Sequence, residues 1–236
     1  TKATISGGVH VPQKHDSGHK HVSGTAEYID DMLEPAGTLH AYLGLSTNAH
    51  GEIQSLALEA VRQAPGVVGV LTAVPGHNDI SQPGKHDEPI FAETRVEFFG
   101  QPLFAVVATT REAARRAARL AQVSYTELPF ALDVAAAREA GGALVTPGMT
   151  LERGDVETGM VAAKNRVKGT MEMGGQDHFY LEGHIAMAIP GEDDEVTVHS
   201  STQHPSEVQH MVGHALGVPS NAVNVVVRRM GGGFGG

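Results

Sequence analysis

The most informative stretch of this sequence is RRMGGGFGG, residues Arg228–Gly236, in which five glycines surround one phenylalanine. Glycine adopts left-handed backbone angles and has no Cβ, so such a loop can approach another group closely. The apolar run Val223–Val227 before it predicts a buried strand, and we expect the loop to leave the end of a sheet. Such a loop offers backbone N–H groups to an anion or to an oxygen atom of a cofactor. A simple turn would also explain these residues, so other parts of the sequence are needed to choose between a turn and a ligand-binding loop.

Composition narrows the class of protein. The 236-residue chain carries a net charge of −10, which argues against a nucleic-acid-binding surface. It has no cysteine, which excludes disulfides, thiolate zinc sites and cysteine-ligated iron–sulfur clusters within these residues. No apolar run approaches the roughly 18–20 residues that span a bilayer, and no signal peptide is visible. We therefore expect a cytoplasmic protein without a membrane segment.

Residues 16–128 are predicted to form one compact α+β domain. A helix is expected over Leu56–Gln63 and another over Arg111–Ala121, with Thr109 or Thr110 as its N-cap. Residues 1–15 are polar and predicted to be a mobile lead-in, while residues 129–149 are rich in Ala and Gly and predicted to connect two domains. The predicted strands are Leu39–Leu45, Val67–Thr72, Leu103–Ala108 and Val123–Glu127.

Residues 150–236 are predicted to begin a second, mixed α/β domain. Strands are expected at Val167–Met173, Glu195–Ser200 and Val223–Val227. Pro205 suits the first position of a helix that runs to about Leu216 and is stopped by Gly217 and Pro219. The glycine loop would then follow the last strand of this domain.

A second conspicuous motif is Gly174-Gly175-Gln176. Two glycines place a polar amide at the end of a predicted strand, just before an apolar run. The NH₂ group of such a glutamine can donate a hydrogen bond to an oxygen atom. A tight turn with a solvated glutamine is the alternative, and the motif alone leaves both open.

Histidines raise the question of a metal site. His210 and His214 are four residues apart on the predicted helix, which places them on one face and fits a zinc pair. Met211 stands where the zinc-protease pattern has glutamate, and no third ligand is evident, so we favour a structural role. Four more histidines cluster near the N-terminus and are expected to be solvated: His10, His15, His19 and His21.

Three motifs occur together in a fixed order: GQDHFYLE at Gly175–Glu182, STQHPSEVQ at Ser201–Gln209, and RMGGGFGG at Arg229–Gly236. The stretches His21–Tyr28 (HVSGTAEY) and Gly100–Pro102 (GQP) add to them. Together they resemble the molybdenum hydroxylase family, which includes xanthine dehydrogenases and aldehyde oxidases. The form of GQDHFYLE is most similar to the xanthine dehydrogenase branch. With no cluster-binding cysteine region ahead of residue 16, the chain resembles the N-terminal part of the separate molybdenum-binding subunit of bacterial xanthine dehydrogenases.

This resemblance implies a fold, a reaction and a set of partners. Residues 16–128 would be an α/β hammerhead domain, and residues 150–236 the first part of a molybdopterin-binding domain. The family hydroxylates a purine, such as xanthine or hypoxanthine, or an aldehyde with oxygen from water. Its cofactor is molybdenum-molybdopterin. The 2Fe-2S clusters and FAD would lie on a partner chain or on other segments, so the resemblance implies a hetero-oligomer of the remaining molybdenum-domain polypeptide and an iron–sulfur/flavin subunit.

The resemblance also implies roles for four residues. Gln176 matches the family's glutamine that hydrogen-bonds a ligand of the metal. Phe234 and Gly235 match the loop that lies against the molybdenum centre, and Gly233 permits the close approach. Gln176 and Phe234 would thus lie beside the metal's ligands. The glutamate that follows the loop, the substrate-orienting arginine and the general-base glutamate of the family have no counterpart before Gly236, so no catalytic residue is expected within this chain.

Three alternatives stay open at this point. The chain could serve an aldehyde-type rather than a purine-type hydroxylase. It could be a non-catalytic assembly or binding module with the hammerhead fold. It could also be a zinc enzyme that uses His210 and His214.

Overall fold

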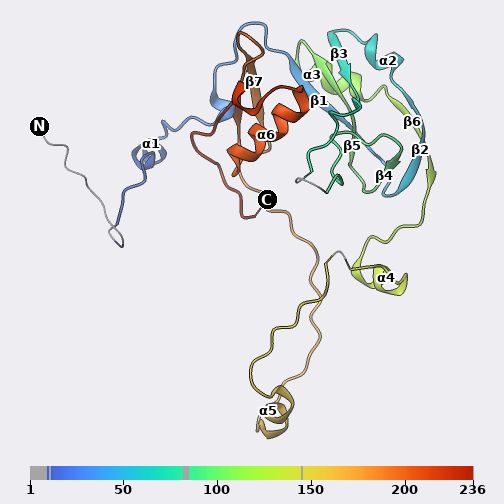
Figure 1. Ribbon diagram of the computed structural model, residues 1–236, viewed down its shortest axis with the longest axis vertical. Coiled ribbons are helices and arrows are strands. Elements are labelled where there is room, and N and C mark those ends of the chain that lie inside the picture. The colour runs from blue at the N-terminus through green and yellow to red at the C-terminus, as the bar shows by residue number, and fades with distance from the viewer. Residues whose placement is uncertain (1–9, 11, 82–84, 145, 236) are drawn as a thin grey trace, which may run out of the picture.

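The computed structural model describes residue 10 and residues 12–81, 85–144 and 146–235. The mobile lead-in predicted for residues 1–15 lies mostly outside these residues. The described chain forms two lobes, which we call the N-terminal lobe (residues 40–127) and the C-terminal lobe (residues 183–235). An extended segment, residues 146–182, which we call the arm, precedes the C-terminal lobe (Figure 1). Within the described chain, no helix combines the length and hydrophobicity needed to cross a membrane.

The N-terminal lobe contains two small sheets. In the first, β5 (Pro102–Ala108) lies between β1 (His40–Leu45) and β3 (Val67–Leu71), and both pairs are antiparallel. In the second, β2 (Gly51–Ala57) lies between β4 (Arg95–Val96) and β6 (Gln122–Glu127). The predictions for β1, β3, β5 and β6 are confirmed within a residue or two at their ends.

The core of this lobe is centred on β5. Leu103, Phe104 and Val106 are almost fully buried, so this strand is apolar on both faces. Helix α3 (Arg111–Ala118) packs its alanine face, including Ala114 and Ala117, against β1 and β5. Burying an apolar side chain of this size contributes about 1.5–3 kcal/mol, so this strand supplies much of the lobe's stability.

Two helix predictions need correction. The helix expected over Leu56–Gln63 is only one turn, α2 (Glu59–Arg62), because residues Gly51–Ala57 pair as β2 with β6. Tertiary pairing here overrides the local helical pattern. The second predicted helix begins as expected, with the Thr110 side chain accepting a hydrogen bond from the Ala113 N–H at 3.1 Å, but ends at Ala118 rather than Ala121.

The C-terminal lobe is a three-stranded sheet covered by one helix. The strand order is β7 (Ala186–Pro190), β8 (Val196–Ser200), β9 (Val223–Val226). Strands β7 and β8 are antiparallel, whereas β8 and β9 are parallel, because helix α6 (Pro205–Leu216) and the short η2 (Ser220–Ala222) return the chain. The predicted helix bounds are confirmed, and Gly217 ends the helix with a φ of +70°.

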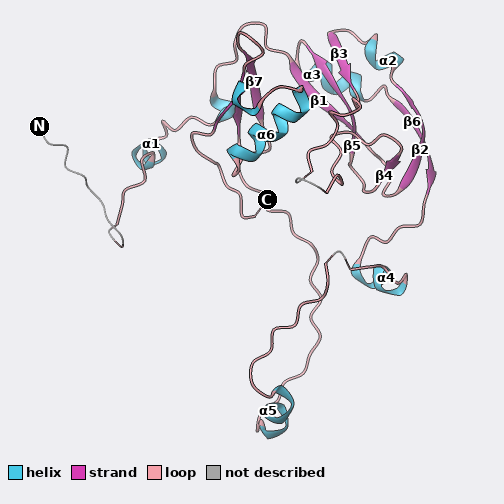
Figure 2. Cartoon of the chain, viewed as in Figure 1, coloured by secondary structure: helices cyan, strands magenta, loops and turns pink. Residues whose placement is uncertain are grey.

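The arm contains the clearest error of sequence interpretation. The strand predicted at Val167–Met173 is absent: the segment is irregular, and Val167 is 98% and Met173 82% exposed. A strand requires a hydrogen-bonding partner, and the described chain provides none there. The arm instead contains helix α5 (Val156–Ala162), and the connecting segment contains helix α4 (Val134–Glu139) (Figure 2). Neither helix was predicted, and each is capped by an aspartate side chain.

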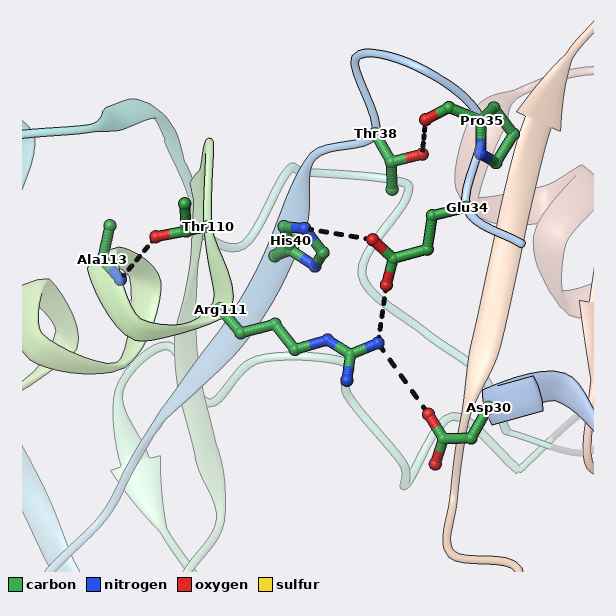
Figure 3. Close-up of polar contacts among 8 residues, drawn as sticks. All are labelled: Asp30, Glu34, Pro35, Thr38, His40, Thr110, Arg111 and Ala113. Atoms are coloured by element: carbon green, nitrogen blue, oxygen red, sulfur yellow. Dashed lines mark hydrogen bonds and ion pairs between the residues drawn. The ribbon is translucent and has the colours of Figure 1, made fainter. Parts of the chain in front are cut away.

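The segment before β1, residues 24–39, which we call the strap, runs between the two lobes. It follows α1 (Gly18–Ser23) and contains η1 (Ile29–Asp31). Arg111 of α3 donates to Glu34 at 2.7 Å and lies 3.9 Å from Asp30, while His40 lies 3.6 Å from the other oxygen of Glu34 (Figure 3). These exposed ion pairs fix the strap's position rather than add much stability.

Two strand glycines provide a matched test of the packing around β5. A Cβ at Gly44 of β1 would lie 2.1 Å from ring atoms of Phe104, whereas a Cβ at Gly69 of β3 would meet nothing within 4 Å. Gly44→Ala should destabilise the lobe by about 1–3 kcal/mol through overpacking. Gly69→Ala should be neutral or stabilising by up to about 1 kcal/mol, because alanine has less backbone freedom to lose. Thermal unfolding of the full-length protein measures both, and equal midpoints would contradict this packing.

Candidate functional site

The glycine loop follows β9 and is bound to the GQDHFYLE motif. The backbone N–H of Gly231 donates to Oε2 of Glu182 at 2.7 Å. The backbone N–H of Glu182 points back to the carbonyl oxygen of Gly231 at the long distance of 3.5 Å. One residue of the first motif therefore faces both the N–H and the C=O of one residue of the last.

Three consecutive glycines of the loop lie close against the two other motifs. A Cβ at Gly231 would lie 2.3 Å from Cβ of Glu182, and one at Gly232 would lie 2.6 Å from Cβ of Tyr180. Gly232 also has a φ of +126°, which side-chain-bearing residues rarely adopt. A Cβ at Gly233 would lie 2.7 Å from Nε2 of Gln203. The close approach expected from the sequence is thus made to the chain's own two other motifs.

The tip of the loop is open. Phe234 has a φ of +56° and is 79% exposed, and Gly235 has a φ of +94°. Among the described residues, none accepts a hydrogen bond from the backbone N–H groups of Gly232, Gly233 or Phe234. Successive N–H groups on a glycine-rich turn are suited to an anion or a cofactor oxygen.

Gln176 lies in the irregular segment before the motif's contact with the loop. It is exposed and makes no hydrogen bond to another described residue. The chain reaches the loop two residues later, where Nε2 of His178 would lie 3.9 Å from a Cβ at Gly235. The structure therefore brings Gly231, Gly232 and Gly235 beside residues 178–182 and Gly233 beside Gln203, while the Gln176 side chain faces solvent.

Sequence reasoning gave no site role to several residues that shape this loop. Arg229 donates through Nη1 to the carbonyl oxygen of Glu27 in the strap, and its Nε is buried without a hydrogen-bond partner among the described residues. Oε1 of Glu182 accepts from the N–H of Ile29 at 3.4 Å. The signal was available, because Glu27, Glu182, Gln203 and Arg229 all lie within the quoted motifs.

Of the histidine pair of helix α6, the His210 ring is hydrogen-bonded within the protein, whereas the contact of His214 is through its backbone carbonyl. Nδ1 of His210 lies 3.0 Å from the hydroxyl of Ser220, and Nδ1 of His77 lies 3.0 Å from the carbonyl oxygen of His214. Within the part of the chain that the structure describes, no group of three or more histidine or carboxylate side chains is placed to hold a metal ion. The zinc alternative therefore gains no support from the geometry.

Two open grooves lie away from the loop. One, of about 1170 Å³, lies between the strap, β1 and β7, and the other, of about 1580 Å³, lies beside β2 and β4. Arg115 and Glu112 stand at the rim of the first, where hydrogen bonds from Arg115 and then Arg116 lower the pKa of Glu112 to about 2. Neither groove is lined by the glycine loop or by Gln176.

Comparison with known proteins identifies the family. The model of the a/b hammerhead domain of aldehyde oxidase and xanthine dehydrogenase matches residues 23–129, and that of the molybdopterin cofactor-binding domain matches residues 139–236. The chain belongs to the molybdenum hydroxylase family. The prediction of an α+β molybdenum hydroxylase chain, with a hammerhead domain followed by a molybdopterin-binding domain, is confirmed.

Individual molybdenum hydroxylases are similar over nearly the whole chain. A xanthine dehydrogenase of Drosophila pseudoobscura pseudoobscura is 38% identical over 232 residues, covering 95% of this chain and 17% of that protein. The structure of quinoline 2-oxidoreductase from Pseudomonas putida 86 matches with a TM-score of 0.76 at 26% identity, over 93% of this chain and 30% of that one. Aldehyde oxidoreductase from Desulfovibrio gigas gives a TM-score of 0.73 at 26% identity, over 92% and 26%. The chain thus spans 17% of the length of the xanthine dehydrogenase it matches.

The steric limits at the loop give a testable prediction. Gly232→Ala should displace the loop, because alanine is disfavoured at a φ of +126° and its Cβ would meet Tyr180. Arg228 is already exposed, and a displaced loop would release the partly buried Arg229, so trypsin should cut after Arg229 at least about fivefold faster in the native full-length protein. Gly169→Ala is the control, since Gly169 has open space around it and no positive φ. Equal cleavage of the two variants would show that the loop tolerates a side chain at 232.

Proposed function

We propose that the full-length protein is a molybdenum hydroxylase that oxidises a purine such as xanthine or hypoxanthine with oxygen from water. The observation that carries this is the glycine loop, whose base contacts the two other family motifs and whose exposed tip presents N–H groups that have no acceptor among the described residues. The 38% identity to a xanthine dehydrogenase favours the purine class of substrate. Electrons would pass to iron–sulfur and flavin centres elsewhere in the assembly.

The residues of the loop fit a bound molybdenum-molybdopterin. The exposed tip at Phe234 and Gly235 is where a bulky group could approach, and the N–H groups of Gly232, Gly233 and Phe234, which have no acceptor among the described residues, could donate to its oxygen atoms. The cofactor, when bound, supplies the redox chemistry. The proposed contribution of this chain is orientation: the backbone around Gly233, Phe234 and Gly235 would line the centre, and Gln176 would donate to an oxygen on the metal.

The proposed assembly follows from the chain's composition and from its relatives. With no cysteine among its 236 residues, the chain cannot ligate a 2Fe-2S cluster through thiolates. We therefore propose that the iron–sulfur and FAD centres, and the catalytic base and substrate-orienting residues, lie on the remaining molybdenum-domain polypeptide and on an iron–sulfur/flavin subunit in a cytoplasmic hetero-oligomer. The proposed domains keep the bounds 16–128 and 150–236.

The second candidate is an aldehyde-type hydroxylase, which the similarity to an aldehyde oxidoreductase structure favours. The substrate test is direct. The full-length protein is purified with its partners, its molybdenum and pterin are quantified, and turnover is compared on xanthine, hypoxanthine and an aromatic aldehyde. Purine turnover is expected. Turnover of the aldehyde alone would favour the second candidate, and absence of molybdenum would leave a non-catalytic module.

A truncation prediction checks the proposed division of labour. The isolated 236 residues should oxidise xanthine no faster than a buffer blank, because the catalytic base and electron acceptors lie outside them. The readout is uric acid formation at 295 nm with an artificial electron acceptor. Clear turnover by this chain alone would contradict the proposed division.

Gln176 provides the mutational prediction for this site. Gln176→Ala in the full-length protein should lower turnover by about 10–100-fold, by analogy with the loss of groups that orient metal ligands. Gln54→Ala is the matched control, because Gln54 is exposed and lies on β2 of the N-terminal lobe, whereas the loop belongs to the C-terminal lobe. Unchanged kinetics with unchanged molybdenum content in Gln176→Ala would remove Gln176 from the site.

A further inference from the structure

We propose that Glu182 is a positioning residue, which fixes the position and orientation of the glycine loop through its hydrogen bond with Gly231. Its consequence for turnover rests on the proposed function, whereas its effect on the loop does not. The role differs from that of a catalytic base, since its carboxylate is committed to backbone N–H groups of the protein.

The strongest contact in this arrangement is the bond from the Gly231 N–H to Oε2 of Glu182 at 2.7 Å. A hydrogen bond to an ionised carboxylate is shorter and about twice as strong as one between neutral groups. The side chain is half-buried, which limits competition from water. The absence of a side chain on Gly231 brings its backbone against Cβ of Glu182, so the carboxylate and its stem together define where the loop begins.

The second oxygen connects the loop to the strap. Oε1 of Glu182 faces the N–H of Ile29 at 3.4 Å, at the first residue of η1. Arg229 reaches the carbonyl oxygen of Glu27 from the other side. The loop is thus connected to strap residues 27–29 in two ways. Arg229 bonds to the strap directly, and Gly231 is connected to it through the Glu182 side chain.

The strap in turn is fixed to the N-terminal lobe. Asp30 and Glu34 face Arg111 at the start of α3, with Glu34 held also by His40 (Figure 3). Glu182 therefore lies where the C-terminal lobe's loop meets an element anchored on the N-terminal lobe. Its chemistry suits this place, because a carboxylate can accept from two backbone N–H groups at once, whereas a glutamine offers one acceptor and one donor.

The experiment measures the loop itself. Hydrogen exchange with mass spectrometry is followed on the full-length protein for the peptide that covers residues 229–235, with β9 as internal reference. Loss of the charge-assisted bond should speed exchange of the Gly231 N–H within this peptide by about 10-fold or more in Glu182→Ala. Glu182→Gln should give a smaller increase, and it also serves if the alanine variant fails to fold. Glu172→Gln is the control, because Glu172 is exposed and has no hydrogen-bond or ion-pair partner in the described chain.

Two further readouts separate positioning from general damage. In the molybdenum-loaded protein, Glu182→Gln should change the Mo(V) electron paramagnetic resonance signal and lower kcat with little change in KM, while the melting temperature stays within about 2 °C. Loop exchange within twofold of wild type in both Glu182 variants would overturn the proposal. A full-length protein without molybdenum would overturn the proposed function, but faster loop exchange in it would still support the role of Glu182.

Discussion

A backbone fit without room for a Cβ holds the candidate site together. Gly231 and Gly232 lie against the Cβ atoms of Glu182 and Tyr180 at distances that exclude a side chain, and Gly233 lies against the amide end of Gln203. The three family motifs therefore depend on one another: the glycines are needed because the other two motifs occupy the space beside them. The open tip around Phe234 can present N–H groups outward because the base of the loop is fixed in this way.

The local patterns of the sequence predicted most of the elements around this site. Strand β5 and helices α3 and α6 were recognisable because their apolar runs, the Thr110 cap, Pro205 and Gly217 are signals that act over a few residues. Strand β2 was not predicted, and its last two residues were assigned to a helix, since its partner β6 lies some seventy residues away, with Ser124 opposite Ser55. The strand expected at Val167–Met173 has the right residues but no partner strand within the described chain.

At the site, too, local features could be predicted from the sequence, whereas contacts between distant segments could not. That the loop contains indispensable glycines follows from the sequence, because only glycine accepts such angles and contacts. The sequence does not show that Glu182 accepts from the N–H of Gly231, or that Arg229 donates to Glu27. These contacts depend on how the two lobes and the strap are placed. Motif order identifies which segments matter, and three-dimensional placement is needed to say which atoms meet.

The contact between Arg229 and Glu27 joins residues 202 positions apart. During synthesis the strap leaves the ribosome long before its partner, and at about 5–20 residues per second the interval is about 10–40 s. All strands of the N-terminal lobe have been synthesised by residue 127, so this lobe can fold within that interval, before Arg229 is available to the strap. The glycine loop can make its contacts with Glu27 and Glu182 only after residues 229–231 have been synthesised, so the N-terminal lobe can form before the loop takes its position.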